Sequence, residues 1–123
     1  MELLSIHPTE ETPEIQFNAG KGELLIQGRS IPENATEFYF PIINWIRKYC
    51  ESPADNTVLT VAMDYLNSIS QKMVLDILEQ LAELPSATVV WKYEDDDEEM
   101  LEEGKIFETK VDLPFTFIPV PVQ

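Results

Sequence analysis

The sequence predicts a mixed α/β domain with a mostly parallel sheet, and two patterns carry this prediction. Short apolar segments typical of strands alternate with segments whose apolar residues recur at helical spacing. The expected order is β-β-α-β-α-β-α-β, and strands that alternate with helices form parallel pairs with right-handed crossovers. The chain has 123 residues, 44% of them hydrophobic, which is enough to bury one core.

The N-terminal part of the chain predicts a tail and then a hairpin. Residues 1–13 are polar and contain prolines, so we expect a flexible N-terminal tail before a domain of residues 14–123. Two strands are expected at 14–18 and 23–28, joined by a turn that contains two glycines.

The segment IPENATEFYFPIINWIRKYCES predicts a helix. One face of this helix carries apolar residues at helical spacing, namely Phe38, Ile42, Trp45, Ile46 and Tyr49. Two overlapping capping boxes compete to begin it, Ser30 with Glu33 and Asn34 with Glu37. Because Pro41 lies inside the segment, the helix either begins late or kinks there, and we expect a kink.

The second half of the chain alternates strands and helices. NTVLTVAMDYL predicts a strand, and its nearly continuous apolar run is typical of a strand covered on both faces. A helix is expected over about 69–83, then a strand at ATVVWKYE. DDDEEMLEEG predicts a short acidic helix that Gly104 ends, and PFTFIPVPV, with three prolines, predicts an edge strand.

Three strand-to-helix loops should converge, because parallel strands place such loops at one edge of the sheet. These loops are Ser30–Asn34, Asn67–Ser70 and Glu94–Asp97. In the middle loop, Ser68 and Gln71 match a capping box, in which the serine hydroxyl only begins the helix. The same helix start also suits a phosphate, because free N–H groups and the helix dipole attract an anion. Both interpretations stay open on the residues alone.

The strongest compositional feature is a formal net charge of −15. This charge argues against binding to nucleic acid and excludes anionic membranes. Two interpretations stay open: the charge keeps the protein soluble, or it attracts a protein partner with a basic patch. No apolar run approaches the roughly 20 residues that cross a bilayer, and the first residues lack the pattern of a signal peptide. The single cysteine, Cys50, fits a reducing compartment, so we expect a cytoplasmic protein.

The sequence contains little that could carry catalysis. The only histidine, His7, lies in the expected tail, so Ser68 has no base of the usual kind. The acidic run Asp95–Asp97 fails the EF-hand pattern, since Met100 stands where glycine is required. A weak Mg²⁺ site on these carboxylates is the alternative to a helix start whose acids favour the dipole. We expect no enzymatic activity, no cofactor and no metal.

Four segments in this chain resemble a known family. They are GRSIPENATEFYFPIINWIRKY, MDYLNSISQKMVLDIL, VVWKYEDDDEEMLEEGKIF and the closing PFTF. In this order, over about residues 12–117, they resemble the SiaC-type regulatory phosphoproteins of bacteria. The resemblance implies a STAS-like fold, with the phosphoacceptor at the start of a helix.

The resemblance also implies a switch. A partner kinase phosphorylates one hydroxyl residue in members of this family, and a PP2C-like phosphatase removes the phosphate. The dephosphorylated form binds a diguanylate cyclase and promotes cyclic-di-GMP synthesis, which favours biofilm formation. Ser68 in LNSIS matches the acceptor threonine of the family's LNTSS pattern, and Ile69 stands where that pattern has serine. Ser70 is the nearest competing acceptor.

The residues expected to bind partners surround Ser68 on the same edge of the sheet. They are Glu33, Asn34, Asn67, Ser70 and Lys72. Asn67 and Ser70 are expected to shape the loop, and Lys72 to pair with the phosphate or with an acidic partner. Three other functions compete with this one. The first is an anti-sigma-factor antagonist that works by partner switching, and the second is a passive interaction domain in which Ser68 is only a helix cap. The third is an enzyme that uses the acidic loop and a bound metal.

Overall fold

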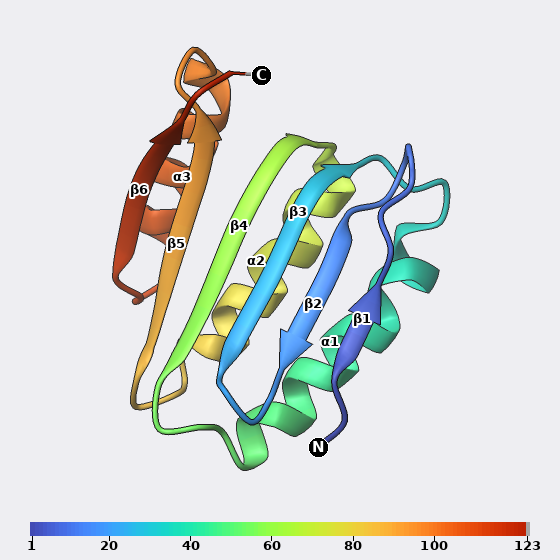
Figure 1. Cartoon of the computed structure of the whole chain (residues 1–123), viewed down its shortest axis with the longest axis vertical. Coiled ribbons are helices and arrows are strands. Elements are labelled where there is room, and N and C mark those ends of the chain that lie inside the picture. The colour runs from blue at the N-terminus through green and yellow to red at the C-terminus, as the bar shows by residue number, and fades with distance from the viewer. Residues whose placement is uncertain (123) are drawn as a thin grey trace.

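The computed structural model describes residues 1–122 and shows one sheet with its helices on one face (Figure 1). The strands are β1 (Leu4–Ile6), β2 (Glu14–Asn18), β3 (Glu23–Ser30), β4 (Thr57–Leu66), β5 (Ala87–Glu94) and β6 (Phe115–Val120). The helices are α1 (Ala35–Glu51), α2 (Ser68–Leu81) and α3 (Glu98–Lys110). The spatial order of the strands follows the chain, from β1 to β6.

The sheet is mixed, as the sequence predicted. β1, β2 and β3 pair in antiparallel fashion, whereas β3 to β6 pair in parallel. Each parallel pair is joined by one helix, so the carboxyl ends of β3, β4 and β5 lead directly into α1, α2 and α3. The predicted α/β class is confirmed, and β6 is an edge strand, as its prolines indicated.

The expectation of a flexible tail over residues 1–13 is wrong at β1. Leu4–Ile6 pair with residues 15–17 of β2. The indole Nε1 of Trp45 on α1 also donates to the backbone oxygen of Glu2 at 3.0 Å. A strand of three residues is too short to show a periodic pattern, which is why the sequence did not reveal it.

The α1 helix begins at the second of the two expected capping boxes. The Asn34 side chain accepts a hydrogen bond from the Glu37 N–H at 3.0 Å. The helix runs without a break across Pro41, so it does not begin late. The fully buried face of α1 consists of Tyr39, Ile42, Ile46 and Tyr49. Phe38 and Trp45, expected in this stripe, are half-buried at its margin.

Gly104 does not end α3, contrary to the sequence prediction. The helix continues to Lys110. A Cβ at Gly104 would lie 2.6 Å from Nε1 of Trp91, closer than real Cβ atoms come, so only glycine lets α3 pack directly on this indole. The indole N–H donates to the Met100 carbonyl at 3.0 Å. Close packing, not helix termination, therefore explains the glycine.

The register shows that all helices of residues 1–122 cover one face of the sheet. Leu59 of β4 lies opposite Val89 of β5, and Val61 lies opposite Trp91, and all four are at most 1% exposed beneath the helices. Thr60, which lies between them, points to the other face because side chains alternate along a strand. Figure 1 shows no helix on that face. The expectation that β4 is covered on both faces is therefore wrong for one of them.

Candidate functional site

Two of the three strand-to-helix loops meet directly. The Asn67 N–H, after β4, donates to the Ser30 carbonyl at the end of β3 at 3.0 Å. The third loop lies further away, because β4 and β5 stop pairing beyond Ala62 and Lys92 and separate at this edge (Figure 1). The predicted convergence of three loops thus holds for the first two.

Three buried hydroxyls hold the first two loops together. Ser30 Oγ lies 2.6 Å from Tyr39 Oη and 2.7 Å from Ser70 Oγ. Ser70 Oγ also donates to the Ser30 carbonyl at 3.1 Å. If Tyr39 donates to Ser30 and Ser30 donates to Ser70, each hydroxyl hydrogen has an acceptor. All three side chains are 0% exposed, and burial raises the pKa of Tyr39, so its phenol stays neutral.

Asn67, and not Ser68, caps α2. Asn67 Oδ1 accepts from the Ser70 N–H at 3.0 Å, and Asn67 has an extended backbone, with φ −75° and ψ 171°. The expected capping box of Ser68 with Gln71 is therefore wrong. Ser68 is the first residue of the helix and its side chain is exposed. Its hydroxyl is not used for capping and faces solvent.

Of the other expected partner-binding residues, one is buried and three are exposed. Ser70 is 0% exposed, so it cannot touch a partner or accept a phosphate in this conformation, and its placement on the recognised surface is corrected. Glu33 and Asn34 are exposed on the neighbouring loop. Lys72 is exposed one turn after Ser68, on the same side of α2.

Ser68 and Lys72 line a groove of about 240 Å³ between α2 and α3. Phe107 contributes to its apolar wall, and Ile106, at 48% exposure, stands at its rim. Lys110 lines the same groove. The sequence analysis missed the α3 side of this groove, because the interpretation of Gly104 as a helix end removed residues 105–110 from the helix.

Glu103 connects α3 to the start of α2. Its Oε1 accepts from Gln71 Nε2 at 2.7 Å, and Gln71 Nε2 also donates to the Leu66 carbonyl at 3.2 Å. Glu103 Oε2 is shielded from solvent and has no hydrogen-bond partner among residues 1–122. Desolvation raises the pKa of Glu103, and the nearby charges of Asp97 and Glu99 raise it further.

The first turn of α2 differs in charge from those of the other helices. The first turn of α1 contains Glu37, and that of α3 contains Glu98 and Glu99, whereas the first turn of α2 contains no acidic residue. Negative charge is favourable at a helix N-terminus. In a chain of net charge −15, the first turn of α2 therefore supplies no carboxylate of its own beside the exposed hydroxyl of Ser68. The Glu103 carboxylate on α3 lines the same groove and accepts from Gln71.

The acidic run Asp95–Asp97 serves as a helix start. Asp97 Oδ1 accepts from the Met100 N–H at 3.0 Å and is the N-cap of α3. Within residues 1–122, no group of three or more His, Cys, Asp or Glu side chains is arranged to hold a metal ion. In the same range, no helix is both long enough and apolar enough to span a membrane.

Known proteins match this chain over almost its whole length. A family model described as SiaC family regulatory phosphoprotein matches residues 6–120. A relative from Pseudomonas aeruginosa (strain UCBPP-PA14) is 31% identical over an alignment of 119 residues, and the match covers 94% of this chain and 94% of the relative. Crystalline apo-SiaC from Pseudomonas aeruginosa, at 30% identity, gives a TM-score of 0.87 over 96% of this chain and 99% of the other. The structure of SiaC from Pseudomonas aeruginosa in complex with the diguanylate cyclase SiaD, which it activates, gives a TM-score of 0.89 at 30% identity. That match covers 95% of this chain and 99% of the other.

Proposed function

The chain belongs to the SiaC family of regulatory phosphoproteins, and we propose that it is a non-enzymatic regulator switched by phosphorylation of Ser68. A partner kinase adds the phosphate, and a PP2C-like phosphatase removes it. The unmodified form binds and activates a diguanylate cyclase, so the output is cyclic-di-GMP signalling and control of biofilm in the cytoplasm. The similarity to the activator in the SiaC–SiaD complex supports this class of partner.

The start of α2 is the observation that carries the proposal. It presents an exposed hydroxyl that is not used for capping, at a helix end that lacks acidic residues. A phosphoryl group adds about −1.5 to −2 charge at pH 7 and is stabilised there by the helix dipole and the first N–H groups. Lys72, four residues after Ser68, stands on the same side of the helix and can pair with the phosphate.

Two exposed apolar side chains near the starts of α1 and α2 support a mechanism by which the phosphate would act. α1 and α2 pack side by side, with Cys50 Sγ donating to the Gln80 carbonyl at 3.7 Å. Near the N-terminal ends of the same two helices, Phe40 is 63% exposed and Ile69 is 41% exposed. An interface that buries these side chains would also have to desolvate the phosphate on Ser68, which costs several kcal/mol for an unpaired charge. The modified chain would therefore release the cyclase.

Phosphorylation in vitro tests the acceptor. With the cognate kinase and ATP, the wild-type chain should gain one phosphate by intact mass, and Ser68→Ala should gain none. Ser52→Ala is the matched control, because Ser52 is also exposed but caps the far end of α1. Equal labelling of Ser68→Ala and the wild type would reject Ser68 as the acceptor.

Binding to the cyclase tests the switch separately from the acceptor. Ser68→Thr keeps the hydroxyl and should bind as the wild type does, whereas Ser68→Asp should weaken binding at least tenfold. If the chain is a passive interaction domain, the Ser68→Thr and Ser68→Asp variants would bind the cyclase equally well. An anti-sigma-factor antagonist would instead show the loss of affinity towards a sigma-regulating kinase, with no measurable binding to the cyclase.

A further inference from the structure

The face of the sheet opposite the helices is built from two rows of side chains that cross the strands. One row, through the middle of the sheet, is Gln16, Leu25, Thr60, Val90 and Thr116. The next row, towards the carboxyl ends of the parallel strands, is Glu14, Gln27, Ala62, Lys92 and Ile118. The first row therefore carries no charge, whereas the second carries Glu14 on β2 and Lys92 on β5.

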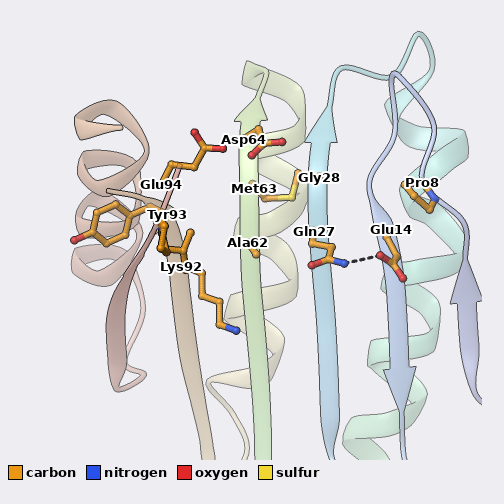
Figure 2. A pocket seen from close by; sticks show the side chains of 12 residues that line it. Pro8, Glu14, Gln27, Gly28, Ala62, Met63, Asp64, Lys92, Tyr93 and Glu94 are labelled. Carbon is orange, nitrogen blue, oxygen red and sulfur yellow. Dashed lines mark hydrogen bonds between the residues drawn. The ribbon is translucent and has the colours of Figure 1, made fainter. Parts of the chain in front are cut away.

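Two hollows of about 580 Å³ and 460 Å³ lie on the open face and share Lys92. Figure 2 shows the first, where the Lys92 side chain reaches from β5 towards β4. On its other side, Gln27 Nε2 donates to Glu14 Oε1 at 2.6 Å. Asp64 and Glu94 stand at the end where β4 and β5 separate. The hollows thus form one depression that crosses the face.

The charges around this depression are mostly negative. Carboxylates of Glu14, Asp64 and Glu94 line the first hollow, and Glu23 lines the second. Lys92 is the one cationic side chain among the lining residues. With a net charge of −15 on the whole chain, the open face attracts a cationic surface and repels a second copy of itself.

The sequence of β4 is more apolar than a strand with one solvent-exposed face requires. Val58, Leu59, Val61 and Ala62 form a nearly continuous apolar run, which is typical of strands packed on both faces. Doubly wound α/β sheets carry a helical layer on each face, whereas the sequential order of β3 to β6 keeps the connecting helices of this sheet on one face. Within residues 1–122, the helices supply only one of these layers, so Val58 and Ala62 remain half-buried.

We propose that a cationic amphipathic helix of a partner protein docks on the open face and supplies the missing layer. The apolar side of that helix packs on Leu25, Val58 and Val90, and its lysine or arginine side chains pair with Asp64 and Glu94. This surface lies on the opposite side of the sheet from α2, so it is a second interface, independent of phosphorylation at Ser68.

A titration followed by NMR tests this proposal on the full chain. The probe is a synthetic 18-residue helix with leucine on one side and lysine on the other. The largest amide shift changes should fall on Thr60, Ala62, Val90 and Lys92. Changes concentrated on α3, which is rich in glutamate, would overturn the proposal, because they would show general attraction to acidic surface.

Two double variants that remove equal charge show whether the peptide binds the open face or is attracted by the net charge of the chain. Asp64→Asn with Glu94→Gln should weaken binding of the peptide about tenfold. The control pair Glu102→Gln with Glu108→Gln removes the same charge from exposed positions of α3 and should change affinity less than twofold. Equal losses in the two pairs would overturn the proposal.

A second variant tests the centre of the face without removing any carboxylate. Thr60→Lys, in the middle row, should weaken binding at least tenfold, whereas Thr109→Lys in the last turn of α3 should have little effect. Ser68→Asp should leave peptide affinity unchanged, because Ser68 lies on the other side of the sheet. Concentration-dependent dimerisation of the free chain that Thr60→Lys abolishes would assign the face to self-association and overturn the proposal.

Discussion

The starts of α2 and α3 use the same cap but carry charge in different ways. Asn67 accepts from the N–H three residues ahead at 3.0 Å, and Asp97 does the same at 3.0 Å. After the cap, α3 continues with Glu98 and Glu99, whereas α2 continues with Ser68 and an isoleucine. One helix start thus has permanent negative charge, and the other has a hydroxyl on which a charge can be placed and removed.

The two helices are also anchored differently. Beneath α2, Ser70 belongs to a buried set of hydroxyls that ties it to β3. α3 is held by an apolar contact, with Gly104 packed directly on the Trp91 indole. A polar anchor fixes position by hydrogen bonds of defined geometry, which suits a joint that must stay in place while its charge changes.

Gly104→Ala should have the largest effect. The added Cβ would meet the Trp91 ring at 2.6–2.7 Å, so α3 must move, and overpacking of this kind costs about 3 kcal/mol of unfolding free energy. Urea unfolding measures the loss. Gly20→Ala is the matched control, since the nearest atom to its new Cβ lies at 3.6 Å, an ordinary contact. Equal stability of the two variants would show that the indole does not anchor α3.

Ser70→Ala should cost about 2 kcal/mol of unfolding free energy, because it leaves the buried Ser30 hydroxyl without one of its partners. Ser68→Ala, two residues away but exposed, should change stability by less than about 0.5 kcal/mol. The same urea titration measures both variants. A loss at Ser68 as large as that at Ser70 would mean that the Ser68 hydroxyl has a structural role after all.

Exchanging the charges of the two helix starts should give small effects of opposite sign. Ser68→Asp supplies the missing acid at the start of α2 and should stabilise the chain by about 0.5 kcal/mol. Glu98→Gln removes an acid from the start of α3 and should destabilise it by about the same amount. Thermal unfolding at low and at 1 M salt measures both, and screening should reduce both at high salt. Stability changes of the same sign in both variants would contradict the proposed difference in charge between the starts of α2 and α3.

Much of this comparison could be predicted from the sequence. Apolar periodicity located the main strands and the three helices, and chain order placed the loops at one edge. The cap of α2 was assigned one residue too late, because asparagine and serine are both good N-caps and only backbone geometry distinguishes Asn67 from Ser68. With Asn67 as the cap, Ser68 is left with one of the two roles expected from the sequence, that of the phosphate acceptor, because its hydroxyl does not cap the helix.

Other features depend on contacts between distant parts of the chain. Nothing local shows that Ser70 is buried, since its partners Ser30 and Tyr39 lie on other elements. Likewise, Gly104 is typical of a helix end by local rules, and only its contact with Trp91 gives the real reason for it. Both errors arose where tertiary packing overrode a local preference.

Glu103→Gln tests the contact between α3 and the start of α2 and should have the smallest effect. Desolvation, then Asp97 and Glu99, raise the pKa of Glu103, so the folded chain holds this proton more tightly than the unfolded chain does. Ionisation therefore costs stability, with no cost below about pH 4 and the full cost at neutral pH. Because Glu103 is half-buried, solvent screens this cost. Glu103→Gln should thus stabilise the chain by a few tenths of a kcal/mol at pH 7 and by nothing at pH 3.5, as measured by urea unfolding at both pH values. Glu108→Gln, exposed on the same helix, is the control. A stabilisation by Glu103→Gln that is as large at pH 3.5 as at pH 7 would show that the carboxylate charge is not its cause.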